Sequence, residues 1–268
     1  MRSTHASLAA VMTWAATVVI VAAQSSQPFL PRELNEWTLE YTLSGGMAFR
    51  IHSVSLTSSG ALAAGDSALG HRISARASDD TVAKVRGLLT LATRPKPSGR
   101  PIPDVPMTAL VVKTGGKSYD IAAPSDLFKT LDDAFNAAVA QALIGEWRQS
   151  AWKLCKPVAQ LGPADIDPAI ESLIFQEDGT LSVTWPGGPR TTGVPHADVA
   201  DYAGHYSVRP ENGVIRMRID GGRFVPGDFD GEGTFALADG TLTIRDAWFG
   251  TKQAKHKPDI CELTFVRK

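Results

Sequence analysis

Residues 202–219 read YAGHYSVRPENGVIRMRI, and this stretch shows most plainly how the second half of the chain is built. Apolar and polar side chains alternate on both sides of the short polar segment at 210–212, which predicts two half-buried strands joined by a tight turn. In the second of these strands three apolar side chains share one face and two cations share the other: Ile215, Met217 and Ile219 against Arg216 and Arg218.

The same two-residue alternation recurs throughout residues 144–268. Several connections are short and rich in turn-forming residues, so successive strands are expected to pair antiparallel, up and down. Closing such strands into a barrel removes exposed strand edges. The sequence therefore predicts an all-β, eight-stranded up-and-down antiparallel barrel, with strands at 144–152, 170–176, 180–186, 202–209, 213–219, 232–238, 240–247 and 260–267.

Residues 32–143 have a different, mixed pattern and predict an α+β domain. One helix is expected to begin with Ser78 as its N-cap. A longer amphipathic helix follows Pro124, with Ser125 as its cap, and ends the domain near Leu143. The domain joins the barrel without a linker, so the two are expected to be rigidly coupled. Strands are expected within 37–56 and at 71–76, a proline-rich extended loop at 95–106, and a hairpin formed by 107–112 and 117–121.

The first residues follow the order of a secretory signal: Arg2, an uncharged apolar run from Leu8 to Val21, and small residues up to Ala23. This predicts a signal peptide at 1–23, an extended segment at 24–31, and a periplasmic or secreted protein. The apolar run is short and rich in alanine for a membrane span, which needs roughly 20 apolar residues. Retention of the segment as an uncleaved anchor is the alternative.

Charge and motifs narrow the function classes. The formal net charge is −1 with both signs interspersed, so nucleic acid is not an expected partner, because phosphate contacts need a concentrated basic face. No nucleophile-elbow or zinc-ligand spacing is present. We therefore expect no catalytic residue, no cofactor and no metal. The acidic stretch from Asp228 to Glu232 leaves a calcium loop as an alternative.

The chain contains two cysteines, Cys155 and Cys261, which allow a single pairing. In an exported chain a disulfide is the expected state, and two buried thiols are the alternative. The first and last strands of a closed barrel pair antiparallel, and a disulfide between them would bring Trp147 close to Arg267.

The barrel region resembles the lipocalin family. Its first strand contains Gly145-Glu146-Trp147, and Arg267 lies at the end of the last strand. In lipocalins the tryptophan of this G-x-W motif is covered by a late arginine or lysine, a cation–π contact that closes one end of the barrel. The resemblance implies this structural role for Trp147 and Arg267.

The first domain resembles emfourin-like domains, which are known as inhibitors of thermolysin-like metalloproteases. The resemblance is carried by the stretch from Ser44 to Ala48 and by the order of the predicted strands and helices. It implies a protein partner for this domain, with a protease as one candidate. No inhibitory residue can be matched.

An eight-stranded barrel is wide enough to be filled by side chains or to hold one small ligand. The predicted function is an exported, non-enzymatic binding protein, with the barrel holding a small apolar ligand and the first domain contacting a protein. The alternatives are a structural or regulatory envelope protein with a filled barrel and no ligand, and a hydrolase built from loops. The predicted ligand-binding residues are Trp185, Tyr202, Tyr206, Met217 and Phe235.

Overall fold

A computed structural model describes residues 29–31, 33–45, 50–96, 106–154, 170–184, 201–222, 229–249 and 260–268. The predicted signal peptide at 1–23, residues 24–28 of the predicted extended segment, Cys155 and Trp185 lie outside these residues. Within the described ranges, no helix is both long enough and apolar enough to cross a membrane.

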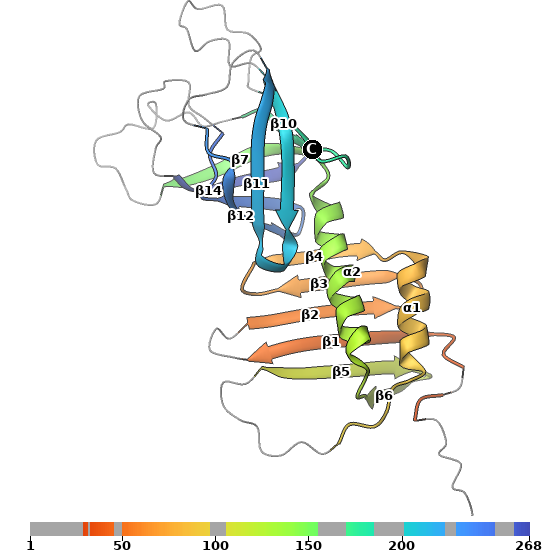
Figure 1. Ribbon diagram of the computed structural model, residues 1–268. Helices are drawn as coiled ribbons and strands as arrows, with labels where there is room; N and C mark the ends of the chain where they lie inside the picture. Colours follow the sequence, from red (N-terminus) through yellow and green to blue (C-terminus); the bar gives the residue numbers. More distant parts are fainter. Residues whose placement is uncertain are drawn as a thin grey trace, which may run out of the picture.

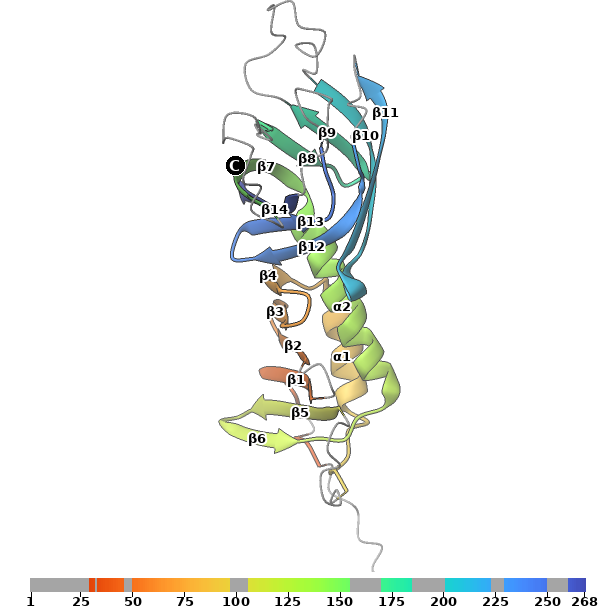
Figure 2. The same ribbon diagram turned by 90° about the vertical axis from the view of Figure 1, so that its left-hand side faces the viewer.

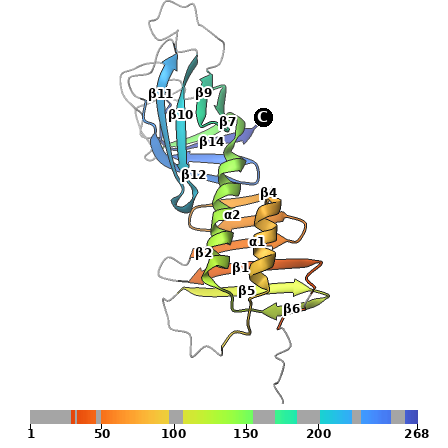
Figure 3. The same ribbon diagram turned by 45° about the vertical axis from the view of Figure 1, so that its right-hand side comes forward.

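The first part of the chain is an antiparallel sheet with two helices side by side on one face (Figures 1 and 3). Its strands lie in the order β4-β3-β2-β1-β5-β6. The side chains that face the helices, such as Leu39, Leu56 and Val112, are fully buried. The elements are β1 (Trp37–Gly45), β2 (Arg50–Thr57), β3 (Ala61–Asp66), β4 (His71–Arg76), α1 (Asp79–Leu89), β5 (Met107–Thr114), β6 (Lys117–Asp120) and α2 (Ser125–Leu143).

The two helices begin differently. Ser78 is the N-cap of α1, as predicted, and its hydroxyl accepts a hydrogen bond from the Thr81 amide at 3.1 Å. The prediction that Ser125 caps α2 is wrong, because Pro124 holds the N-cap position with an extended backbone and no side-chain cap bond. Proline suits the start of a helix because the amide it lacks would have no partner within the helix.

The strand β3 was not predicted. Its sequence, ALAAGD, contains a single large apolar residue, Leu62, and its alanines and glycine favour strands weakly. It forms because β2 and β4 flank it on both sides and supply backbone hydrogen bonds along its length.

The second part is a closed ring of eight antiparallel strands. Each strand pairs with the next in sequence, β7 also pairs with β14, and β11 meets β12 over Val214–Arg216. The predicted number of strands, their order and their closure are therefore confirmed, with small differences at the strand ends. The strands are β7 (Gly145–Leu154), β8 (Ser172–Phe175), β9 (Thr180–Thr184), β10 (Asp201–Arg209), β11 (Val214–Gly222), β12 (Glu232–Ala238), β13 (Thr241–Arg245) and β14 (Ile260–Arg267).

The two parts share one sheet of fourteen strands, joined where β12 lies beside β4 (Figure 2). This contact is parallel and consists of a single pair, Ala238 opposite Arg72. Helix α2 spans the joint, because it packs on β2 and β4 and also contacts β12 and the short helix η1 (Pro210–Asn212). The expected close coupling of the two parts has this physical basis.

Gly204 lies where two ring strands come unusually close. A bulge between Ala203 and Gly204 brings the backbone of β11 against β10. A methyl group on Gly204 would collide with the Arg218 carbonyl. Only glycine fits such a backbone approach.

We therefore expect Gly204→Ala to lower the free energy of unfolding by about 1–3 kcal/mol, the usual cost of overpacking. Gly87→Ala is the matched control, because the added methyl group would meet open space among the described residues, apart from the neighbouring backbone of α1 itself. That change should raise the free energy of unfolding by about 0.5–1 kcal/mol. Urea unfolding measures both, and equal stability of Gly204→Ala and wild type would contradict the close approach.

The register of β7 and β14 brings the residues next to both cysteines to the same end of this strand pair. Leu154 lies opposite Ile260, one residue before each cysteine in the sequence. Cys261 lies on β14 and Cys155 outside the described residues, so the pairing remains a prediction.

A disulfide that closes a loop of roughly a hundred residues stabilises a fold by about 4–5 kcal/mol in the chain-entropy model. Reductant should therefore lower the melting temperature of the wild type clearly, and Cys261→Ala should lower it to a similar value. Reductant should have no further effect on Cys261→Ala. A melting temperature of the wild type that reductant leaves unchanged would contradict the disulfide.

Candidate functional site

Most of the residues predicted to bind a ligand in the ring lie in its hydrophobic core, as far as the structure describes them. Tyr202, Met217 and Phe235 are buried within the hydrophobic core, Tyr206 is partly buried, and Trp185 lies outside the described residues. Phe235 packs against His71 of β4, with ring centroids 5.1 Å apart, so it belongs to the joint between the two parts.

The two tyrosine hydroxyls were expected to orient a ligand, and both have partners in the chain. Tyr202 donates to the Phe249 carbonyl at 2.5 Å, and Tyr206 donates to the Gln176 carbonyl at 2.8 Å. The Tyr206 ring also lies edge-on to Phe175, with centroids 4.8 Å apart. These contacts make the described interior of the ring a packed core.

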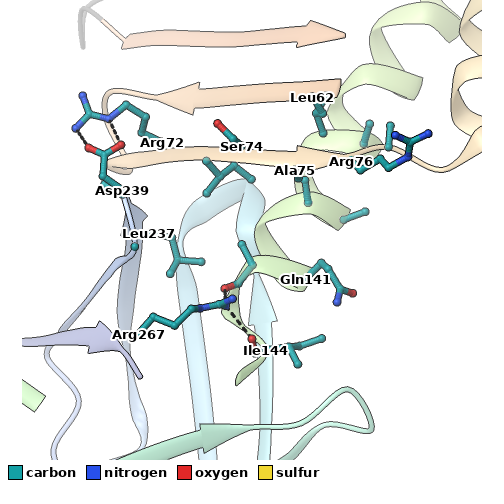
Figure 4. A pocket seen from close by; sticks show the side chains of 18 of the residues that line it. Leu62, Arg72, Ser74, Ala75, Arg76, Gln141, Ile144, Leu237, Asp239 and Arg267 are labelled. Atoms are coloured by element: carbon teal, nitrogen blue, oxygen red, sulfur yellow. Dashed lines mark hydrogen bonds and ion pairs between the residues drawn. The ribbon is translucent and has the colours of Figure 1, made fainter. Parts of the chain in front are cut away.

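An open cleft of about 850 Å³ lies instead between the two parts, and we call it the junction cleft (Figure 4). One wall is β4, from Arg72 to Arg76. The second wall is α2, and the third is the base of the ring at Trp147, Asp239 and Arg267. A volume of this size is within the usual range for ligand-binding sites.

The cleft is open along α2 because most of the side chains that this helix presents to it are small, and Gln141 is the one longer residue of α2 in its lining. Four alanines of the helix line the space, and none extends beyond its Cβ methyl group. Ala134 and Ala138 are buried beside β4, whereas Ala137 is exposed. A larger side chain at these positions would fill the cleft. The alanines are Ala134, Ala137, Ala138 and Ala142.

Trp147 and Arg267 form one end of the cleft and complete the end of α2. The Arg267 guanidinium lies 4.9 Å from the centroid of the Trp147 ring, and the two residues are opposite each other in β14 and β7. Their predicted proximity is therefore confirmed.

Both side chains bond the last carbonyls of α2, which have no partner within the helix. Arg267 donates to the Ala142 and Ile144 carbonyls at 2.6 and 2.8 Å, and Trp147 donates from Nε1 to the Leu143 carbonyl at 2.7 Å. The last turn of α2 contains no basic residue. Arg267 therefore supplies the cation that favours a helix C-terminus.

The cleft is positively charged. Its lining contains three arginines and one aspartate. Arg72 is paired with Asp239, and Arg267 is held by Trp147 and the helix carbonyls. The Arg76 side chain is exposed and has no ion pair or hydrogen bond with any described residue, and it stands apart from the other two arginines in Figure 4.

His71 holds the other end of the joint. Its Nδ1 accepts a hydrogen bond from the Leu237 amide at 3.2 Å, which requires this nitrogen to be unprotonated. The ring is 2% exposed and lies against Phe135 and Phe235, and its Nε2 has no hydrogen-bond partner among the described residues. Burial lowers the pKa of His71 from 6.5 to about 4, although the nearby Asp66 carboxylate acts in the opposite direction.

A buried polar cluster around Asp66 has a structural role. Asp66 is fully buried and accepts hydrogen bonds from Arg50 at 2.7 Å, from His52 at 3.1 Å, and from the Ala68 and Leu69 amides. Burial raises the pKa of the Asp66 carboxyl, but the bonds from Arg50 and Leu69 outweigh it, so the pKa is lowered overall. The cluster fixes the turn between β3 and β4 and so positions His71.

Sequence reasoning missed the junction cleft. Arg72 and Arg76 lie in a strand that was predicted, and the four alanines lie on a helix that was predicted. The signal was present in part, because β4 alternates two exposed arginines with apolar residues. The sequence pattern did not indicate that β4 lies beside the ring.

Comparison with protein-family models, with curated proteins and with solved structures finds no match to this chain. In the ranges that the structure describes, no three His, Cys, Asp or Glu side chains gather where they could hold a metal ion.

His71 stabilises the folded state only while its imidazole ring is neutral. Because its pKa is lowered on folding, its contribution is fully present above pH 6.5 and is lost as the pH falls toward about 4. A shift of this size corresponds to about 3 kcal/mol. His71→Gln keeps an acceptor for the Leu237 amide and removes the titration, so its unfolding free energy should fall less than that of the wild type over this range.

Urea unfolding at pH 7 and pH 4.5 compares the two proteins, and NMR titration of the His71 ring gives its pKa directly. An unfolding free energy that falls equally in both proteins, or a pKa of His71 near 6.5, would contradict this role.

Proposed function

We propose that this chain is a non-enzymatic binding protein and that its binding site is the junction cleft. In this proposal the ring is a lipocalin-like barrel whose core is filled, and it acts as a rigid wall of the site. The protein works in the periplasm or outside the cell, as the predicted signal peptide implies.

The observation that carries the proposal is the composition of the cleft. Binding sites combine an apolar lining with a few placed polar groups. Here the alanines of α2 and Leu237 supply the apolar lining, and Arg76 supplies a cation without a partner among the described residues. With three arginines against one aspartate, the site favours a partner that carries negative charge.

The packing of the ring favours a barrel filled by its own side chains over a barrel that holds a small apolar ligand. The two hydroxyls suited to orient a ligand are satisfied by the Gln176 and Phe249 carbonyls. Large aromatic side chains, among them Phe175 and Phe265, are buried in the same core. The resemblance of the first part to emfourin-like domains favours a protein as the partner, and a protease stays one candidate.

Ala137→Trp tests the proposal, because Ala137 is exposed in α2 and lines the cleft. An indole at this position fills the space without disturbing the buried face of the helix. Ala83→Trp is the matched control, because Ala83 is exposed in α1 and does not line the cleft.

Tagged wild type and both variants are used for affinity capture from the exported fraction, followed by native mass spectrometry. We expect the wild type and Ala83→Trp to retain the same bound species, and Ala137→Trp to retain at least tenfold less. Equal capture by Ala137→Trp, or no bound species on the wild type, would contradict the proposal.

A further inference from the structure

We propose that the junction cleft takes an extended, acidic peptide segment of a partner protein, which adds as a strand to the free edge of β4. This inference rests on the proposed function and names the class of partner. Strand addition is a common way for a sheet edge to bind a peptide, because the main chain supplies affinity and alternate side chains supply specificity.

The backbone of β4 offers hydrogen-bonding groups on the side of the cleft. The Ala77 amide donates to the Gly60 carbonyl, toward β3, whereas the Asp239 amide donates to the Arg72 carbonyl from the side of the ring. Backbone groups alternate along a strand, so Ser74 and Arg76 direct their N–H and C=O groups toward the cleft, as Arg72 does. Among the described residues, no strand pairs with Ser74 or Arg76 on this side.

The edge is free because the neighbouring strand ends early. After its single pair with Arg72, β12 ends at Ala238, and the chain turns back at Asp239 and Gly240. Both turn residues have positive φ, 50° and 78°, which is the backbone of a tight hairpin turn. The hairpin carries the chain away from β4, and the space that it leaves is the junction cleft.

The side chains of β4 set the charge of the partner. Ser74 and Arg76 are exposed and share a face of the strand with Arg72, which Asp239 already neutralises. A residue opposite or diagonal to Arg76 in an added strand would meet an uncompensated guanidinium. Opposite charges in such cross-strand positions attract, and like charges repel. The structure therefore favours an acidic residue there.

The charge of β4 also disfavours a second copy of this chain as the occupant. Antiparallel pairing of β4 with another β4 would place arginines of the two copies opposite one another, because Arg72 and Arg76 alternate along the strand. Such pairs are destabilising.

The other face of an added strand would look toward α2. There Ala134 and Ala138 present methyl groups, and Leu237 closes the space from the ring. Apolar side chains of moderate size fit this face. Because side chains alternate along a strand, the partner segment should alternate acidic or polar residues with apolar ones.

Synthetic peptides test this inference. The probe is acetyl-Thr-Val-Glu-Val-Thr-amide, which places its glutamate on one face and its valines on the other. Its counterparts carry lysine in place of glutamate, N-methyl groups on the valine amides, or an N-methyl group on the glutamate amide. Decanoate is the control ligand, because it has an apolar body and a carboxylate but no peptide backbone. Binding to the full chain is measured by NMR titration.

We expect the glutamate peptide to bind more tightly than the lysine peptide and to shift the amide signals of Ser74 and Arg76. N-methylation at one of the two positions, the valine amides or the glutamate amide, should weaken binding at least tenfold, because those amides bond β4. N-methylation at the other position should leave binding unchanged. Arg76→Gln should weaken binding about two- to fivefold, as expected for a cross-strand charge pair. Arg76→Glu should reverse the preference toward the lysine peptide, and Arg148→Glu on the exposed face of β7 should leave it unchanged.

Binding that neither N-methylated set weakens, or an unchanged charge preference in Arg76→Glu, would overturn strand addition. Decanoate binding that Ala137→Trp abolishes, without peptide binding, would also overturn it but leave the proposed function in place. A dimer in light scattering that Arg76→Pro abolishes, because proline removes the cleft-facing amide at this position, would assign the edge to a second copy instead. Failure of the proposed function is recognised separately, by capture experiments in which Ala137→Trp behaves like the wild type.

Discussion

The structure depends on a constraint at one residue pair, where Ala238 of β12 meets Arg72 of β4. This contact joins the ring to the first sheet, and the hairpin turn that follows it limits the contact to that pair. His71 secures the joint by accepting a hydrogen bond from the Leu237 amide in a buried position. A longer pairing would have covered the edge of β4 and left no cleft.

A second contact holds the opposite end of the cleft. Arg267 and Trp147 belong to the last and first strands of the ring, and together they bond the three final carbonyls of the α2 region. Gly145 lies beside this contact with a φ of 133°, a backbone conformation that favours glycine, and the Arg267 guanidinium is within ordinary van der Waals distance of where a Cβ would stand. The residues that close the ring also fix α2 against it.

The ring could be predicted from sequence because each of its strands shows its own alternation. The proximity of Trp147 and Arg267 followed from closing the ring with the two cysteines paired. The joint could not be predicted, since the sequence pattern of neither β4 nor β12 indicates that the two strands pair. The cleft was hidden for a related reason. An alanine that lines the cleft, such as Ala138, lies in the same apolar stripe of α2 as a fully buried side chain, such as Val139.

The central claim is that β12 is fixed to β4 at the joint while the rest of the β4 edge stays unpaired, and amide hydrogen exchange tests it residue by residue. The account predicts slow exchange at the Leu237 amide, which bonds His71, and fast exchange at the Ser74 and Arg76 amides, which face the cleft. Fast exchange at Leu237 would show that the joint does not hold. Slow exchange at Ser74 and Arg76 in the isolated chain would show that the edge is already covered.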